Sequence, residues 1–291
     1  MATPSSYDGI LAANVNGRQK QFYSKILPAA HVAQKYHTSW ACTGYPGAGG
    51  WQTGASATPV TTNVDSNTAG AFPLISPTSA SGQKPHLLAF GAGQDTGATA
   101  MAGHILLVDR LADLGSIATV IGTGAVTFPG GLARYADGEG VMASVEILSS
   151  TPSLSTVQIS KYTNQDGTTN RVGAVSDTLT ATPLHRWVGS GGSMFLGLAA
   201  GDRGIRSIEE ITIGAVNAAN FSIVLYKIIS KIPCSVVGGW VERDFAIQIA
   251  DLPPFPVNAS NYSSCLQWVF LPNAATASGS VFSGETLTTT V

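Results

Sequence analysis

The run VMASVEIL at residues 141–148 alternates apolar and mixed side chains, one residue at a time. A period of two indicates a β-strand, because successive side chains point to opposite faces of a sheet. A second alternating run, residues 157–163, leads into the tetrapeptide NQDG at 164–167, and Asp-Gly is a hairpin turn signal. We therefore expect residues 168–175 to return as the partner strand.

Similar β-like runs lie on both sides of this hairpin, separated by Gly, Pro, Asn and Asp. They are residues 86–90, 104–110, 194–198, 208–214, 221–229, 266–271 and 280–288. Helical periodicity is nearly absent after residue 30. The chain is therefore expected to be mainly β, with an antiparallel β-sandwich or jelly-roll-like domain over residues 86–291.

Residues 1–85 have a different pattern and form the second predicted region. A short helix is expected over residues 6–16, because apolar residues fall on one face and Asn16-Gly17 supplies a stop. Between Lys35 and Lys84 the only charged residue is Asp65, and neither period persists. Fixing such a backbone costs about 1–2 kcal/mol per residue, so something must hold it. We expect an extended, charge-poor arm, lying on its own domain or on a neighbouring subunit. Its candidate anchoring residues are Trp40, Tyr45, Trp51 and Phe72.

The composition limits the classes of partner. Only 11% of residues are charged, against about 25% in typical proteins, which favours a surface hidden in an assembly over a neutral secreted one. The net charge of −2 and the lack of a basic stripe argue against nucleic-acid binding. No apolar run approaches the roughly 20 residues of a membrane span, and residues 1–10 do not resemble a signal peptide. The three scattered cysteines fit folding in a cytoplasm.

No spacing typical of an active site is present. The chain has no GxSxG elbow and no CxxC pair, and its five histidines form no metal-binding pattern. Glu209 and Glu210 are adjacent, so on a strand they point to opposite faces. We therefore expect no enzyme activity, no catalytic residues, no cofactor and no metal, although a fold can bring distant carboxylates together.

Two charged clusters interrupt the neutral background. Both lie in Gly-rich turns that lead into strands, and an Arg fork can bind a carboxylate through two hydrogen bonds. We expect these residues to brace turns within one chain or to cross a subunit interface. The candidates are Arg134, Asp137, Asp202, Arg203 and Arg206.

Four motifs follow one another along the chain around these clusters. They are LVDRL at 107–111, RYADGEGV at 134–141, YTNQDG at 162–167 and AGDRGIRS at 200–207. The set resembles a group of tailed-bacteriophage virion proteins, which also open with a short helix, an Asn-Gly and a neutral aromatic segment with Gly-Ala-Gly, here residues 47–49. The resemblance covers about residues 5–288. Ala133 and Ala136 stand where the pattern has Pro and Thr, which leaves that turn less rigid.

The resemblance implies a structural component of a phage particle, without catalytic residues. We expect a capsid-associated minor capsid or decoration protein that cements the head, folded and assembled in the host cytoplasm. Its partners would be itself, as a trimer or another homo-oligomer, and virion proteins such as the major capsid protein. The alternative is a tail or fibre component with a carbohydrate-binding β-sandwich. A secreted β enzyme is the third possibility.

Overall fold

The computed structural model describes most of the chain. The described residues are 9, 18–50, 61–74, 85–118, 122–128, 131–148, 155–179, 185–215, 220–245, 253–255 and 264–290. All elements with described bounds are strands, and every pairing between them is antiparallel. The helix expected over residues 6–16 lies outside the described residues except for Gly9. Within these ranges, no helix is long and apolar enough to cross a membrane.

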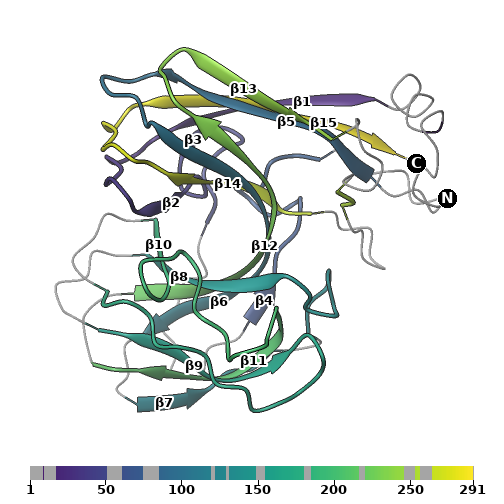
Figure 1. Cartoon of the computed structure of the whole chain (residues 1–291), viewed down its shortest axis with the longest axis vertical. Helices are drawn as coiled ribbons and strands as arrows, with labels where there is room; N and C mark the ends of the chain where they lie inside the picture. The colour runs from purple at the N-terminus through teal and green to yellow at the C-terminus, as the bar shows by residue number, and fades with distance from the viewer. Residues whose placement is uncertain are drawn as a thin grey trace.

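A closed six-stranded barrel forms the middle of the molecule (Figure 1). Its strands, in order around the barrel, are β12 (Asn220–Cys234), β8 (Val141–Ile147), β10 (Arg186–Val188), β2 (Tyr36–Thr38), β14 (Leu266–Leu271) and β6 (Gly103–Ala118). β6 pairs with β12 along nearly its whole length and closes the ring, which leaves no free edge. β4 (Thr61–Asn63) adds to β6 beyond the end of β14.

A five-stranded sheet covers one side of the barrel, at the top of Figure 1. Its order is β13 (Gly239–Asp244), β5 (Pro85–Thr96), β15 (Val281–Thr290), β1 (Gln19–Ile26) and β3 (Thr43–Tyr45). The apolar core between this sheet and the barrel is rich in aromatic rings, among them Tyr23, Phe90, Trp268, Phe270 and Phe282. Tight aromatic packing of this kind supplies large buried apolar areas and fixes the sheet on the barrel.

A three-stranded sheet covers the opposite side of the barrel, at the bottom of Figure 1. Its order is β7 (Gly122–Ala125), β11 (Ile205–Ile213) and β9 (Val157–Asn164). Its core is mostly aliphatic and includes one face of β8, from Val141 to Ile147. The alternation in β8 is confirmed: its apolar face packs on this sheet, and its other face points into the barrel.

The predicted hairpin at residues 164–167 is confirmed at its turn. Gly167 N donates to Asn164 O over 3.0 Å, and Gly167 adopts a φ of 81° that favours glycine. Residues 168–175 return beside β9 through isolated bridges at Arg171 and Val175 instead of a continuous strand. The principal partner of β9 is β11.

The sheets do not follow the predicted division at residue 85, and the described part of the predicted arm contains strands. β2 and β4 belong to the barrel sheet and β3 to the five-stranded sheet, so residues from both predicted regions share the same sheets. Residues 36–50 and 61–74 thus lie on their own domain, because β-pairing and buried aromatic side chains hold them there. The mainly β, antiparallel class is correct, while the closed barrel between two sheets does not confirm a jelly roll.

Candidate functional site

The barrel encloses a charged pair. Arg110 on β6 and Glu146 on β8 both point inward, and Arg110 Nη1 lies 2.8 Å from Glu146 Oε2 with both side chains fully buried. Arg110 Nε donates to Asp113 Oδ1 over 2.7 Å. The guanidinium also lies 4.4 Å from the centre of the Trp40 ring. Two carboxylates and an aromatic face therefore replace the water that this cation loses.

Burial and charge act in opposite directions on the ionisation of each member of this pair. It raises the pKa of Glu146 to about 7, against the opposing effect of the Arg110 charge. Burial would lower the pKa of Arg110, but the charges of Asp113 and Glu146 outweigh it and raise that pKa. No opening reaches this pair, because both side chains have no exposed surface. The pair therefore has a structural role in the barrel.

A second buried pair joins Arg134 to Asp109. The Arg134 fork donates from Nη2 to Asp109 Oδ1 over 2.8 Å and from Nε to Oδ2 over 3.2 Å. Arg134 Nη1 also donates to the carbonyl of Val64 over 2.8 Å. Cys265 N completes the shell of Asp109 at 2.9 Å. Arg134 thus fastens the loop before β8 to β6 and to the residue after β4, while Asp109 also binds the residue before β14.

Asp202 is the centre of an outer network. Its carboxylate accepts hydrogen bonds from Arg171 Nε at 2.9 Å, Asn164 Nδ2 at 2.8 Å and the Tyr162 hydroxyl. Burial raises the pKa of Asp202, but these bonds, above all the one from Arg171, outweigh it and lower the pKa to about 2. The loop before β11 is thereby tied to the hairpin after β9.

The remaining predicted residues extend the outer network. Arg203 pairs with Glu139, Nε to Oε1 at 3.0 Å, on the exposed surface. Arg206 Nε donates to the carbonyls of Gln165 at 2.9 Å and Asp137 at 3.1 Å. The Asp137 carboxylate accepts from Glu139 N within its own turn. All five predicted charged residues thus have partners inside this chain, and their role at an interface stays a prediction.

The acidic partners Asp109, Asp113 and Glu146 were not among the residues predicted from the sequence. A signal for them exists, because Asp109 and Arg110 are adjacent charges inside the apolar run from Ile105 to Leu114. Charges in such a run are buried only when they are paired. The sequence does not show which distant residues supply the pairing.

The four predicted anchoring aromatics divide between core and surface. Trp40 is fully buried and its Nε1 donates to the carbonyl of Gly50 over 3.0 Å. Phe72 is also buried and stacks on Tyr23 with ring centres 4.3 Å apart. Tyr45 is 58% exposed, and Trp51 lies outside the described residues. Only Tyr45 among the described three can therefore contact a partner.

An aromatic groove crosses the outer face of the five-stranded sheet. It encloses about 290 Å³ and is walled by Tyr45, Phe22 and Trp240, with Ser24 and Ser283 on its floor. The three aromatic side chains are 58%, 59% and 44% exposed, respectively. Tyr45 is one of the predicted anchoring residues, but the groove was not predicted, because its three rings come from the separate strands β3, β1 and β13.

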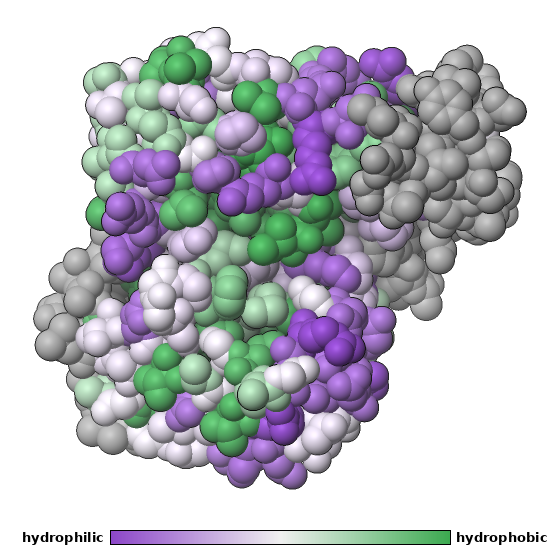
Figure 2. All heavy atoms as spheres, in the orientation of Figure 1, coloured by the Kyte–Doolittle hydropathy of each residue, from purple (hydrophilic) through white to green (hydrophobic). Residues whose placement is uncertain are grey.

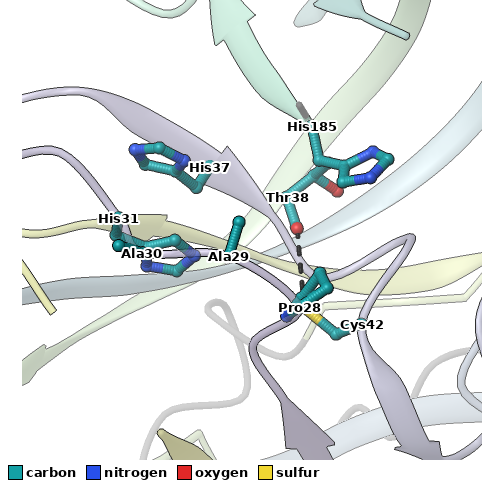
Figure 3. Close-up of a pocket in the computed structure, with 8 residues that line it drawn as sticks. All are labelled: Pro28, Ala29, Ala30, His31, His37, Thr38, Cys42 and His185. Atoms are coloured by element: carbon teal, nitrogen blue, oxygen red, sulfur yellow. Dashed lines mark hydrogen bonds between the residues drawn. The ribbon is translucent and has the colours of Figure 1, made fainter. Parts of the chain in front are cut away.

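Histidines line a small cavity where β2 meets the loop after β1 (Figure 3). The His31 and His37 rings stack with centres 4.2 Å apart, and His185 and Cys42 lie on the cavity wall. Burial lowers the pKa of His31 well below its usual value and lowers the pKa values of His37 and His185 to about 4. The cavity volume of about 10 Å³ has room for a single water molecule. A substrate does not fit there.

The described residues contain no group of three or more His, Cys, Asp and Glu side chains placed to hold a metal ion. The three cysteines are buried and unpaired with one another. Burial raises the pKa of the Cys42 thiol to about 12, which disfavours the nucleophilic thiolate.

No family model, curated protein or solved structure matches this chain.

Proposed function

We propose that this chain is a structural subunit of a tailed-phage particle. It acts without catalysis, as a capsid-associated minor capsid or decoration protein that packs against copies of itself and against the major capsid protein. A closed ring such as a trimer fits this role. The four motifs that resemble phage virion proteins support the assignment.

The observation behind this proposal is that the chain has few charged residues and buries several of them, so its surface carries little charge. The chain has 15 Lys and Arg and 17 Asp and Glu, and at least seven of these side chains are buried. They are Lys25, Asp109, Arg110, Asp113, Arg134, Glu146 and Glu285. In Figure 2, hydrophilic residues gather in a few groups between broad apolar and near-neutral areas. A surface so poor in charge favours association, because charge keeps monomers apart in solution.

A contact surface for this packing is available beside the three-stranded sheet. Val172, Val175 and Phe195 are all exposed. Their segments are adjacent, since Ala174 N donates to the carbonyl of Gly197 over 2.7 Å. We define these three side chains as the lower apolar patch. Apolar side chains gathered on a surface are typical of interaction sites.

Sedimentation with purified empty phage heads tests the proposal. We expect recombinant protein to co-sediment with heads, and Val175→Asp with Phe195→Ser to abolish this because a charge enters the contact. The matched control is Val236→Ser, which changes an equally exposed valine in the turn between β12 and β13. Failure of the wild-type protein to bind heads, together with binding to host cell surfaces, would favour the tail or fibre alternative.

A further inference from the structure

On the outer face of the five-stranded sheet, one row of paired residues crosses all five strands. Register pairs Tyr45 with Ser24, Ser24 with Ser283, Ser283 with Gly93, and Gly93 with Trp240. Four strand spacings separate the two ends, or about 19 Å. Large aromatic side chains therefore stand at both ends of a row whose middle positions are small.

Glycine keeps the floor of this groove low beside Trp240. A Cβ at Gly91 would come within 2.8 Å of Trp240 Nε1, so only glycine leaves room for the indole there. Phe22, in the next row, adds a third ring from β1. The groove thus exposes three rings from three strands of one rigid sheet.

The polar groups around the rings are hydroxyls and carboxylates. Register places Glu242 and Glu285 on either side of Gly91. Burial raises the pKa of Glu242, and the neighbouring Glu285 carboxyl raises it further. Asp95 accepts a hydrogen bond from the Ser283 hydroxyl at the groove floor.

Positive charge is nearly absent from this place. The groove lining contains no Lys or Arg. The nearby Lys20 lies 5.1 Å from the centre of the Phe22 ring and is already paired with Glu285 at 2.8 Å. An anionic ligand would therefore find no Lys or Arg in the groove lining and would lie beside the carboxyl groups of Glu242 and Glu285.

We infer that this groove binds an extended, neutral carbohydrate. The C–H faces of its sugar rings stack on Trp240, Tyr45 and Phe22. Its hydroxyls bond to the exposed carboxyl group of Glu242 beside the groove and to the hydroxyls of Ser24 and Ser283 within it. Ligand sites commonly combine such aromatic walls with a few placed polar groups. A second copy of the chain fits less well, because a stable interface buries about 800 Å² per partner and is depleted of carboxylates at its centre. The inference does not depend on the phage assignment.

An array of neutral and acidic glycans, probed with the full chain, tests this inference. We expect neutral oligosaccharides to bind and Trp240→Ala to weaken that binding at least about tenfold, since it removes a stacking face. Gly91→Ala should also weaken it while retaining all three rings, because the added Cβ displaces the indole. Ile228→Ala, which truncates a 40% exposed apolar side chain on β12 that belongs neither to the groove nor to the lower apolar patch, is the control and should bind like wild type.

Three results would overturn the inference. They are the absence of any neutral glycan among the bound ones, neutral binding that survives Trp240→Ala and Tyr45→Ala together, and self-association that these two substitutions abolish. Circular dichroism and thermal melts verify that each variant is folded. Head binding is measured on the same variants, so loss of glycan binding with intact head binding separates this site from the proposed structural role.

Discussion

At the scale of single residues, the buried ion pair inside the barrel has the largest expected effect, because removing one partner leaves the other charge buried without compensation. Glu146 balances Arg110 inside the barrel at 2.8 Å. Glu146→Gln leaves the guanidinium with less compensation, and breaking such a pair typically costs about 3–5 kcal/mol. We expect this loss in the free energy of unfolding, measured by urea titration.

Two control variants show whether the loss of stability in Glu146→Gln comes from the lost charge or from a change of side-chain shape. Glu210→Gln breaks the exposed pair with Lys161 and should hardly change the unfolding curve. The double substitution Arg110→Met with Glu146→Leu removes both charges and should recover much of the lost stability. If Glu146→Gln were as harmless as Glu210→Gln, the pair would not stabilise the barrel.

The buried histidines predict sensitivity to acid. His31, His37 and His185 have folded-state pKa values below the usual value of about 6.5, because burial disfavours the charged ring. The unfolded chain therefore binds more protons than the folded one, and stability falls as pH drops from about 6.5 towards 4. Each neutral ring contributes a slope of about 1.4 kcal/mol per pH unit in this range. Glu146, with its raised pKa, gives the opposite slope between 4.5 and about 7.

Urea unfolding at pH 7, 6 and 5 measures this dependence. The three histidines outnumber Glu146, so we expect a net loss of stability towards pH 5. His37→Gln should flatten the dependence, whereas His104→Gln, at a partly exposed ring, should change it less. A wild-type protein equally stable at all three pH values would contradict this account of the cavity.

At the scale of elements, the loop before β8 and the loop before β11 cross at two glycines, Gly138 and Gly204. Gly204 lies against Gly138 at the bridge between Glu139 and Gly204, and a Cβ on Gly204 would fall 1.9 Å from the carbonyl oxygen of Gly138. Gly204→Ala should therefore force the loops apart, at a cost of at least about 1–3 kcal/mol. Gly47→Ala is the control, because a Cβ there meets nothing within 4 Å. Equal melting temperatures for the two variants would show that the crossing adapts without cost.

Local pattern predicted the type of the elements better than their extent. The alternation at 141–148 and the turn at 164–167 depend on neighbouring residues, so both were recognisable in the sequence. β6 and β12 were expected at 104–110 and 221–229 but span Gly103–Ala118 and Asn220–Cys234. Three register shifts interrupt the pairing of β6 with β12. Two charged residues of β6 are paired with residues distant in the sequence. No local pattern encodes either feature.

The candidate sites were also only partly predictable from the sequence. The Arg and Asp residues of the Gly-rich turns could be singled out from local composition. Their partners could not, because Arg203 pairs with Glu139, 64 residues away in the sequence. The partners Asp109 and Glu146 were not predictable either, since they lie on strands that meet only through barrel closure. The aromatic groove needs register between β3, β1, β15, β5 and β13, whose order in the sheet differs from their order in the chain.

At the scale of the whole molecule, β6 and β12 connect the two covering sheets. The upper core contains Ile105 and Leu107 from β6 and Ile232 from β12. The lower core contains Leu111 and Leu114 from β6 and Phe221, Ile223 and Leu225 from β12. Because the same two strands pass through both cores, neither core can unfold without losing its barrel strands.

Calorimetry should therefore record one melting transition. Phe270→Ala in the upper core and Ile208→Ala in the lower core each remove buried apolar volume, at a cost of about 2–5 kcal/mol. Both should lower the melting temperature of the entire transition, by roughly 2–4 °C per kcal/mol for a chain near this size. Two resolved peaks, with Ile208→Ala moving only one, would show that the halves fold independently. A single peak would mean that a partner bound at either covering sheet stabilises the whole subunit, because each core contributes to the same cooperative unit.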